Sequence, residues 1–101
     1  MKLYLDDERS APFGWERVET AHEAIRILSE NEVTDLSLDH DLGGPENGTG
    51  YDVIVWIEQQ VAEYGYTPPP IFIHTANPAA SIRMYAALDS IKRLLEHRDR
   101  I

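Results

Sequence analysis

Short apolar segments alternate with amphipathic segments along this chain, and this alternation limits its fold more than any other feature. The apolar segments lie at residues 2–5, 16–18, 36–38 and 71–73 and have the length of β-strands. Three stretches of roughly ten to twenty residues, in which apolar side chains recur at helical spacing, follow the later strands. Strands that alternate with helices are typical of right-handed crossover units. The order predicts an α/β domain with a mainly parallel sheet of about four strands and three main helices.

The predicted helices begin and end at residue types that favour helix termini. Thr20, followed three residues later by Glu23, has the pattern of a capping box before the first helix. The second helix is expected over residues 50–64, with Gly65 at the position of a left-handed C-cap. Asn77 is the expected N-cap of the third helix. These signals leave only short loops between the elements.

Size and composition place the chain among small globular proteins. Its 101 residues, 43% hydrophobic and 27% charged, suit one core, so we expect a single domain over residues 1–101. The absence of cysteine excludes thiolate and disulfide chemistry and leaves carboxylate, imidazole and hydroxyl groups. The chain lacks the apolar core of a signal peptide and an apolar run of membrane-spanning length. We therefore expect a cytoplasmic protein that has no membrane partner.

The charge balance restricts the partners that this surface accepts. The chain carries 18 acidic and 9 basic side chains, which gives a formal charge of −9. A broad acidic surface repels duplex DNA, because it has few cations to replace the counterions of the phosphates. A phosphorylated small molecule or a single RNA end remains compatible, provided that a metal ion neutralises the site that receives it.

Polar side chains follow three of the predicted strands, at the point where each strand ends. Because the carboxyl ends of parallel strands meet at one edge of a sheet, these side chains are expected to lie close together. Clustered carboxylates repel one another unless a divalent cation lies between them, and oxygen ligands favour Mg²⁺, Mn²⁺ or Ca²⁺. Two nearby histidines also allow Mn²⁺, Zn²⁺ or Fe²⁺, and of these ions Mg²⁺ or Mn²⁺ is expected. The residues after the three strands are, in chain order, Asp6, Asp7, Glu8 and Arg9; Asp39, His40 and Asp41; and His74, Thr75 and Asn77.

Each candidate residue also has a structural interpretation. An aspartate at a strand end is often a turn former or a helix cap. His40 and His74 fit either a general acid and a general base on one substrate or two histidines hydrogen-bonded to the backbone. Arg9 is suited to clamp a phosphate through its planar fork, and it is equally suited to neutralise a neighbouring carboxylate such as Asp7.

Four segments in order resemble the cyclic-phosphate processing receiver-like family. They are LDDERxxPxGW at residues 5–15, LDHDLG at 38–43, GTGYDVxxWIE at 48–58 and IHTANP at 73–78. The resemblance implies a small three-layer, flavodoxin-like fold related to the receiver domains of two-component signalling. It further implies processing of cyclic phosphates, such as 2′,3′-cyclic phosphate ends of RNA or cyclic nucleotides.

The receiver comparison assigns roles position by position. Asp6 and Asp7 match the metal-binding acidic pair, Asp39 matches the phospho-acceptor, and Thr75 matches the conserved hydroxyl. The lysine that receivers carry after a fifth strand has no counterpart here. On this comparison Asp6, Asp7 and Asp39 are the expected metal ligands. Asp39, His40 and His74 are the expected catalytic residues, and the expected substrate contacts are Arg9, Thr75 and Asn77.

Three functions remain open at this point. The first is metal-dependent hydrolysis of a cyclic phosphate. The second is a signalling receiver phosphorylated on Asp39, and the missing lysine argues against it because coupling to an output surface has no evident carrier. The third is a non-catalytic binder of a phosphorylated ligand in the same site.

Overall fold

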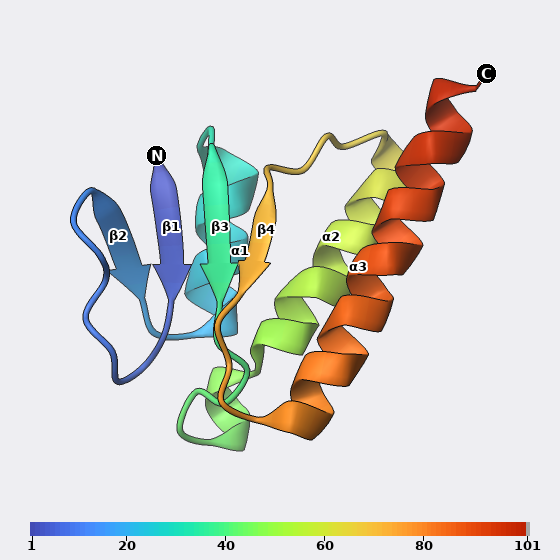
Figure 1. Ribbon diagram of the computed structural model, residues 1–101. Helices are drawn as coiled ribbons and strands as arrows, with labels where there is room; N and C mark the ends of the chain where they lie inside the picture. Colours follow the sequence, from blue (N-terminus) through green and yellow to red (C-terminus); the bar gives the residue numbers. More distant parts are fainter. Residues whose placement is uncertain (101) are drawn as a thin grey trace.

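The computed structural model describes residues 1–100 and contains a four-stranded sheet and three α-helices (Figure 1). All neighbouring strands are parallel, in the order β2–β1–β3–β4. The predicted α/β receiver-like fold is confirmed. The elements are β1 (Lys2–Leu5), β2 (Trp15–Val18), α1 (Ala21–Glu30), β3 (Asp35–Leu38), a short 3₁₀ helix η1 (Pro45–Asn47), α2 (Gly50–Tyr64), β4 (Ile71–Ile73) and α3 (Pro78–Asp99).

The helix ends fall where the sequence signals place them. The Thr20 side chain accepts a hydrogen bond from the backbone N–H of Glu23 at the start of α1. Gly65 ends α2 in the left-handed conformation, with a φ of 69° that glycine adopts without strain. Asn77 caps α3 through its side-chain oxygen. Local capping chemistry therefore marks the start of α1 and α3 and the end of α2.

The hydrophobic core lies on one face of the sheet. The crossovers from β2 to β3 and from β3 to β4 advance in the same direction, so right-handed connections place α1 and α2 on the same side. Figure 1 shows α1 behind the sheet, with α3 running beside α2 beyond the β4 edge. On the two central strands, β1 and β3, the side chains on the covered face are fully buried leucines, namely Leu3, Leu5, Leu36 and Leu38.

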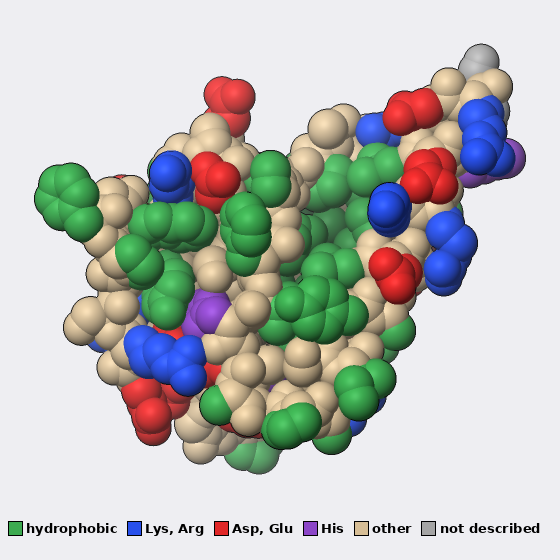
Figure 2. Space-filling model, in the orientation of Figure 1, with side chains coloured by type: hydrophobic (Ala, Val, Ile, Leu, Met, Phe, Trp, Pro, Cys, Tyr) green, Lys and Arg blue, Asp and Glu red, His purple; other side chains and the backbone are tan. Residues whose placement is uncertain are grey.

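The opposite face of the sheet carries no helix within the described residues. In chain order, residues 6–14 connect β1 to β2 directly, and this short loop contains no helix. The predicted three-layer arrangement is therefore wrong in one respect: within residues 1–100 helices cover one face of the sheet and, because β1 and β2 are joined by a short loop, no helical layer covers the other face. Figure 2 shows hydrophobic side chains gathered on it, with a histidine and cationic side chains among them. In the part of the chain that the structure describes, no helix has the length and apolar character needed to cross a membrane.

Candidate active site

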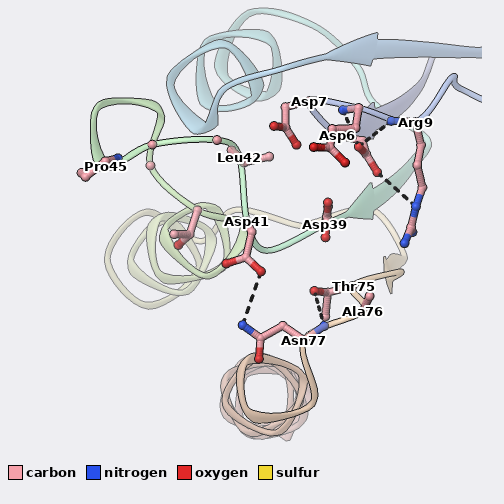
Figure 3. A pocket seen from close by; sticks show the side chains of 15 residues that line it. Asp6, Asp7, Arg9, Asp39, Asp41, Leu42, Pro45, Thr75, Ala76 and Asn77 are labelled. Carbon is pink, nitrogen blue, oxygen red and sulfur yellow. Dashed lines mark hydrogen bonds and ion pairs between the residues drawn. The ribbon is translucent and has the colours of Figure 1, made fainter.

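A pocket of about 630 Å³ lies at the carboxyl edge of the sheet (Figure 3). Its walls come from the loops after β1, β3 and β4 and from the segment that leads into α2. The prediction that three strand ends deliver polar side chains to one place is therefore correct. Six of the predicted site residues line this pocket, namely Asp6, Asp7, Arg9, Asp39, Thr75 and Asn77.

Three carboxylates converge at the base of this pocket. Asp6, Asp7 and Asp39 each offer one oxygen, and these oxygens all lie within 4.8 Å of one another. Among residues 1–100, neither Asp7 nor Asp39 forms an ion pair with a basic side chain. Three anionic groups at this spacing repel one another, and an all-oxygen donor set is what Mg²⁺ and Mn²⁺ prefer. The residues present thus fit a divalent cation.

Asp6 is the most tightly held of the three carboxylates. Its side chain is 1% exposed, and one oxygen accepts hydrogen bonds of 2.8 Å from the backbone N–H groups of both Glu8 and Arg9. The other oxygen lies 3.1 Å from the Nε2 atom of His74. Burial raises the pKa of Asp6, but these hydrogen bonds together outweigh burial and lower the pKa below its usual value. Asp6 is therefore ionised at neutral pH in a fixed orientation.

His74 connects this carboxylate to the sheet. Its Nδ1 atom lies 2.7 Å from the hydroxyl oxygen of Ser37, and its ring stacks on Tyr4 at a centroid distance of 4.2 Å. Burial lowers the pKa of His74, and the hydrogen bond to Asp6 offsets this only in part. When the ring is neutral, its Nε2–H donates to Asp6 and its Nδ1 accepts from the Ser37 hydroxyl, so each of these contacts has one donor and one acceptor. Both ring nitrogens are thus engaged within the protein.

His40 occupies a different position from His74. Its backbone N–H donates to Asp39, and its Nδ1 atom lies 3.0 Å from Asp41, whose other oxygen accepts a hydrogen bond from Asn77. The hydrogen bond with His40 is the main reason that the pKa of Asp41 is lowered. Neither histidine is among the residues that line the pocket. The expectation that His40 and His74 flank one substrate therefore differs from the observed arrangement.

Arg9 and Thr75 present hydrogen-bond donors to the pocket. One terminal nitrogen of Arg9 donates to the backbone oxygen of His74 at 2.7 Å, and its Nε lies 4.0 Å from Asp6. The Arg9 side chain is 50% exposed, so its remaining N–H groups are accessible. The Thr75 oxygen accepts from the backbone N–H of Asn77, which leaves the hydroxyl hydrogen available. These two side chains are suited to bind the oxygens of a phosphoryl group.

The position of Asp39 depends on a close contact between β3 and α2. The N–H of Gly50 donates to the backbone oxygen of His40, and a Cβ atom at Gly50 would collide with the backbone oxygen of Asp39. Thr49 and Asp52 form a reciprocal capping box that fixes the start of this helix. Only glycine allows the helix to begin so near the strand end.

The sequence reasoning missed Ser37 as a site residue. Ser37 is 7% exposed and is a polar residue within the otherwise apolar second half of β3. A hydroxyl in a buried strand needs a hydrogen-bond partner, and His74, directly after the adjacent strand β4, provides it. The isolated serine within a run of leucines was the available signal.

Comparisons with known proteins agree with this geometry. Neither the search of curated proteins nor the search of solved structures finds a match. A family model described as "Cyclic-phosphate processing Receiver domain" matches residues 1–90, a range that includes every strand and every residue of the pocket. The chain therefore belongs to the cyclic-phosphate processing receiver domain family.

Proposed function

We propose that this protein hydrolyses cyclic phosphates, such as the 2′,3′-cyclic phosphate ends of RNA or cyclic nucleotides, with the help of a divalent cation. The observation that carries the proposal is the convergence of three carboxylates within 4.8 Å, beside the free donors of Arg9 and Thr75. Asp6, Asp7 and Asp39 would hold Mg²⁺ or Mn²⁺. When bound, the cation supplies positive charge that opposes the negative charge of the phosphoryl oxygens.

The side chains around the pocket bind the phosphoryl group and transfer the proton. Arg9 binds a non-bridging phosphoryl oxygen through its free N–H groups, and Thr75 donates a hydrogen bond to another. A water oxygen attacks phosphorus and gives up one proton, the bond from phosphorus to one ring oxygen breaks, and the released oxygen takes up that proton. The pair of Asp41 and His40 is assigned this proton transfer, because Asp41 lines the pocket and lies 3.0 Å from the Nδ1 atom of His40, which itself lies outside the pocket lining. His74 is assigned a positioning role, since it orients Asp6.

The test is a ³¹P NMR assay with 2′,3′-cyclic nucleotides and a cyclic-phosphate-ended RNA oligomer, in Mg²⁺, Mn²⁺ or EDTA. We expect ring opening that EDTA abolishes and that Asp39→Asn reduces at least about a hundredfold. The matched control is Asp89→Asn, an exposed aspartate on α3 far along the chain from the pocket residues. An unchanged substrate spectrum in every wild-type sample would overturn the proposal.

A second candidate is a signalling receiver phosphorylated on Asp39. It is favoured by the position of this residue at the end of β3, between the acidic pair and Thr75. The lysines argue against it, because Lys2 begins β1 and Lys92 lines a groove with residues 68–71 at the opposite end of β4. Incubation with a small phosphodonor and Mg²⁺ distinguishes the two candidates, since only a receiver gains the mass of one phosphoryl group.

A non-catalytic binder of a phosphorylated small molecule uses the same donors without chemistry. It predicts that a cyclic nucleotide is retained unchanged by the wild-type protein and released when Arg9 is replaced by methionine. The ³¹P spectrum separates this outcome from hydrolysis, because a bound but intact ring keeps its chemical identity while its signal broadens.

A further inference from the structure

The open face of the sheet carries a cluster of aromatic rings. The Tyr4 ring packs edge-on to Trp15 at a centroid distance of 6.2 Å and stacks on His74 at 4.2 Å, and Tyr4 is only 9% exposed. In the strand register, Ser37 lies between Tyr4 and Phe72, and the Phe72 side chain is 51% exposed. No helix covers these rings in residues 1–100. A parallel sheet normally buries such residues on both faces.

Cations accompany these rings, although the chain as a whole is strongly acidic. The Lys2 ammonium lies over the Trp15 ring, 5.7 Å from its centroid, and Arg17 lies beside Tyr4 in the register. Arg9 is at the rim where this face meets the pocket. Three of the nine Lys and Arg residues are thus placed here, with Asp35 opposite Lys2 and Glu19 in an ion pair of 3.8 Å with Arg17. Figure 2 shows the blue side chains beside the hydrophobic ones on this face.

The aromatic cluster is continuous with the candidate active site. His74 stacks on Tyr4 and also hydrogen-bonds to Asp6 of the carboxylate group. Alternate residues of a strand are separated by about 7 Å and neighbouring strands by about 4.8 Å, so Tyr4 and Phe72 lie one step from the pocket edge, whereas Trp15 on β2 and Phe72 on β4 lie roughly 16 Å apart across the sheet. Rings at this separation suit bases that are not adjacent in an extended single strand, and aromatic rings on a four-stranded sheet suit unpaired bases.

We propose that the open face binds the single-stranded RNA that precedes a cyclic-phosphate end, with Phe72 and Trp15 as stacking surfaces for two bases that are not adjacent in the strand. The inference rests on the proposed function, because it places the terminal phosphate in the carboxylate pocket. The cations beside the rings neutralise the phosphates of the strand. A duplex does not fit this surface, since its paired bases are not free to stack. The substrate class is therefore an RNA end in preference to a free cyclic mononucleotide.

The test measures RNA binding separately from chemistry. A fluorescein-labelled, unstructured RNA oligomer with a 3′-hydroxyl end is titrated in Mg²⁺ at low salt and followed by fluorescence anisotropy. This probe cannot be hydrolysed by ring opening. The variants are Trp15→Ala and Phe72→Ala, and the matched control is Tyr64→Ala, which removes a 73%-exposed ring from α2. Circular dichroism checks that each variant is folded.

We expect each platform variant to weaken RNA binding roughly tenfold, because one base loses its stacking partner, and the control to bind like the wild type. Binding that is unchanged in both platform variants would overturn the proposal, as would the absence of wild-type binding. A concentration-dependent dimer that Phe72→Ala dissociates, without RNA binding, would assign the face to a second copy of the chain instead.

The two proposals fail in distinguishable ways. Cyclic mononucleotide turnover without RNA binding would leave the proposed function standing and reject the RNA platform. RNA binding that depends on Trp15 and Phe72, without any ring opening, would retain the platform and reject the hydrolytic function. A raised KM for the RNA substrate in the platform variants, with little change in kcat, would support both.

Discussion

The two faces of the sheet use the same four strands for different purposes. The face under α1 and α2 presents leucines that are fully buried, and these side chains contact one another and the helices. The other face presents tyrosine, serine, tryptophan and phenylalanine, and its buried polar atoms are hydrogen-bonded. The stability of the folded chain therefore depends mainly on the covered face. The alternate residues of each strand, on the other face, are left free to support a site.

The two faces should differ most in how much the free energy of unfolding falls when a large side chain is replaced by alanine. Leu36→Ala should lower the free energy of unfolding by about 3 kcal/mol, because it removes a fully buried side chain and leaves a cavity. Phe72→Ala, at the half-exposed position of the neighbouring strand, should cost about 1 kcal/mol or less. Urea unfolding of both variants measures the contrast. Equal losses would mean that the open face also supports the fold.

The sequence predicted the covered face well, for a physical reason. Apolar residues at strand and helix spacing, together with the caps at Thr20 and Asn77, are local signals, and local structure followed them. The positions of Asp6, Asp7 and Asp39 were also predictable, since the carboxyl ends of parallel strands must share an edge.

The open face and the roles of the histidines were harder to predict. They depend on a helix that is missing between β1 and β2 and on contacts across three strands. His74, for example, contacts residues 37 and 68 positions away in the chain, namely Ser37 and Asp6. The short link between the first two strands was a signal that no helix would fit there, but its consequence for one whole face emerges only from the topology.

The next prediction concerns the hydrogen bond that ties the open face to the pocket. Ser37→Ala should destabilise the protein by about 1 to 2 kcal/mol, because the buried Nδ1 atom of His74 loses its partner. Ser29→Ala is the matched control, since its hydroxyl donates to a backbone oxygen in an exposed position. NMR of the His74 ring nitrogens should show a changed tautomer or protonation state. An unaltered ring spectrum would contradict the assigned hydrogen bond.

The carboxylates at the end of the sheet should respond differently from one another. Asp7→Asn should raise metal-free stability by about 1 kcal/mol, because it relieves repulsion at a residue with no ion pair in residues 1–100. Asp6→Asn should lower stability, since Asp6 accepts hydrogen bonds from Glu8, Arg9 and His74. Thermal melts with and without Mg²⁺ measure both effects. Stabilisation by Mg²⁺ should be smaller in the Asp7 variant than in the wild type, and equal stabilisation of the two proteins would contradict the assignment of Asp7 as a ligand.

The smallest expected effect is a pH dependence of the free energy of unfolding that arises on the covered side of the sheet. Burial raises the pKa of Tyr66, whose ring packs against the core beside Trp56. The folded state therefore keeps the phenol proton more tightly than the unfolded state does. This contribution to stability is complete below the ordinary tyrosine pKa of about 10 and is lost as the pH rises through the higher folded value. Urea unfolding at several alkaline pH values should show a shallower decline for Tyr66→Phe, and identical profiles would contradict the assignment.

The proposed divalent-cation site lies at the carboxyl ends of β1 and β3. A Mn²⁺ titration followed by electron paramagnetic resonance measures directly whether an ion binds there. The wild type and Asp89→Asn should each bind one Mn²⁺ ion with similar affinity. Asp39→Asn should bind it more than about tenfold less tightly, because one of the three carboxylate ligands is lost. Equal Mn²⁺ affinity in all three proteins would contradict the claim.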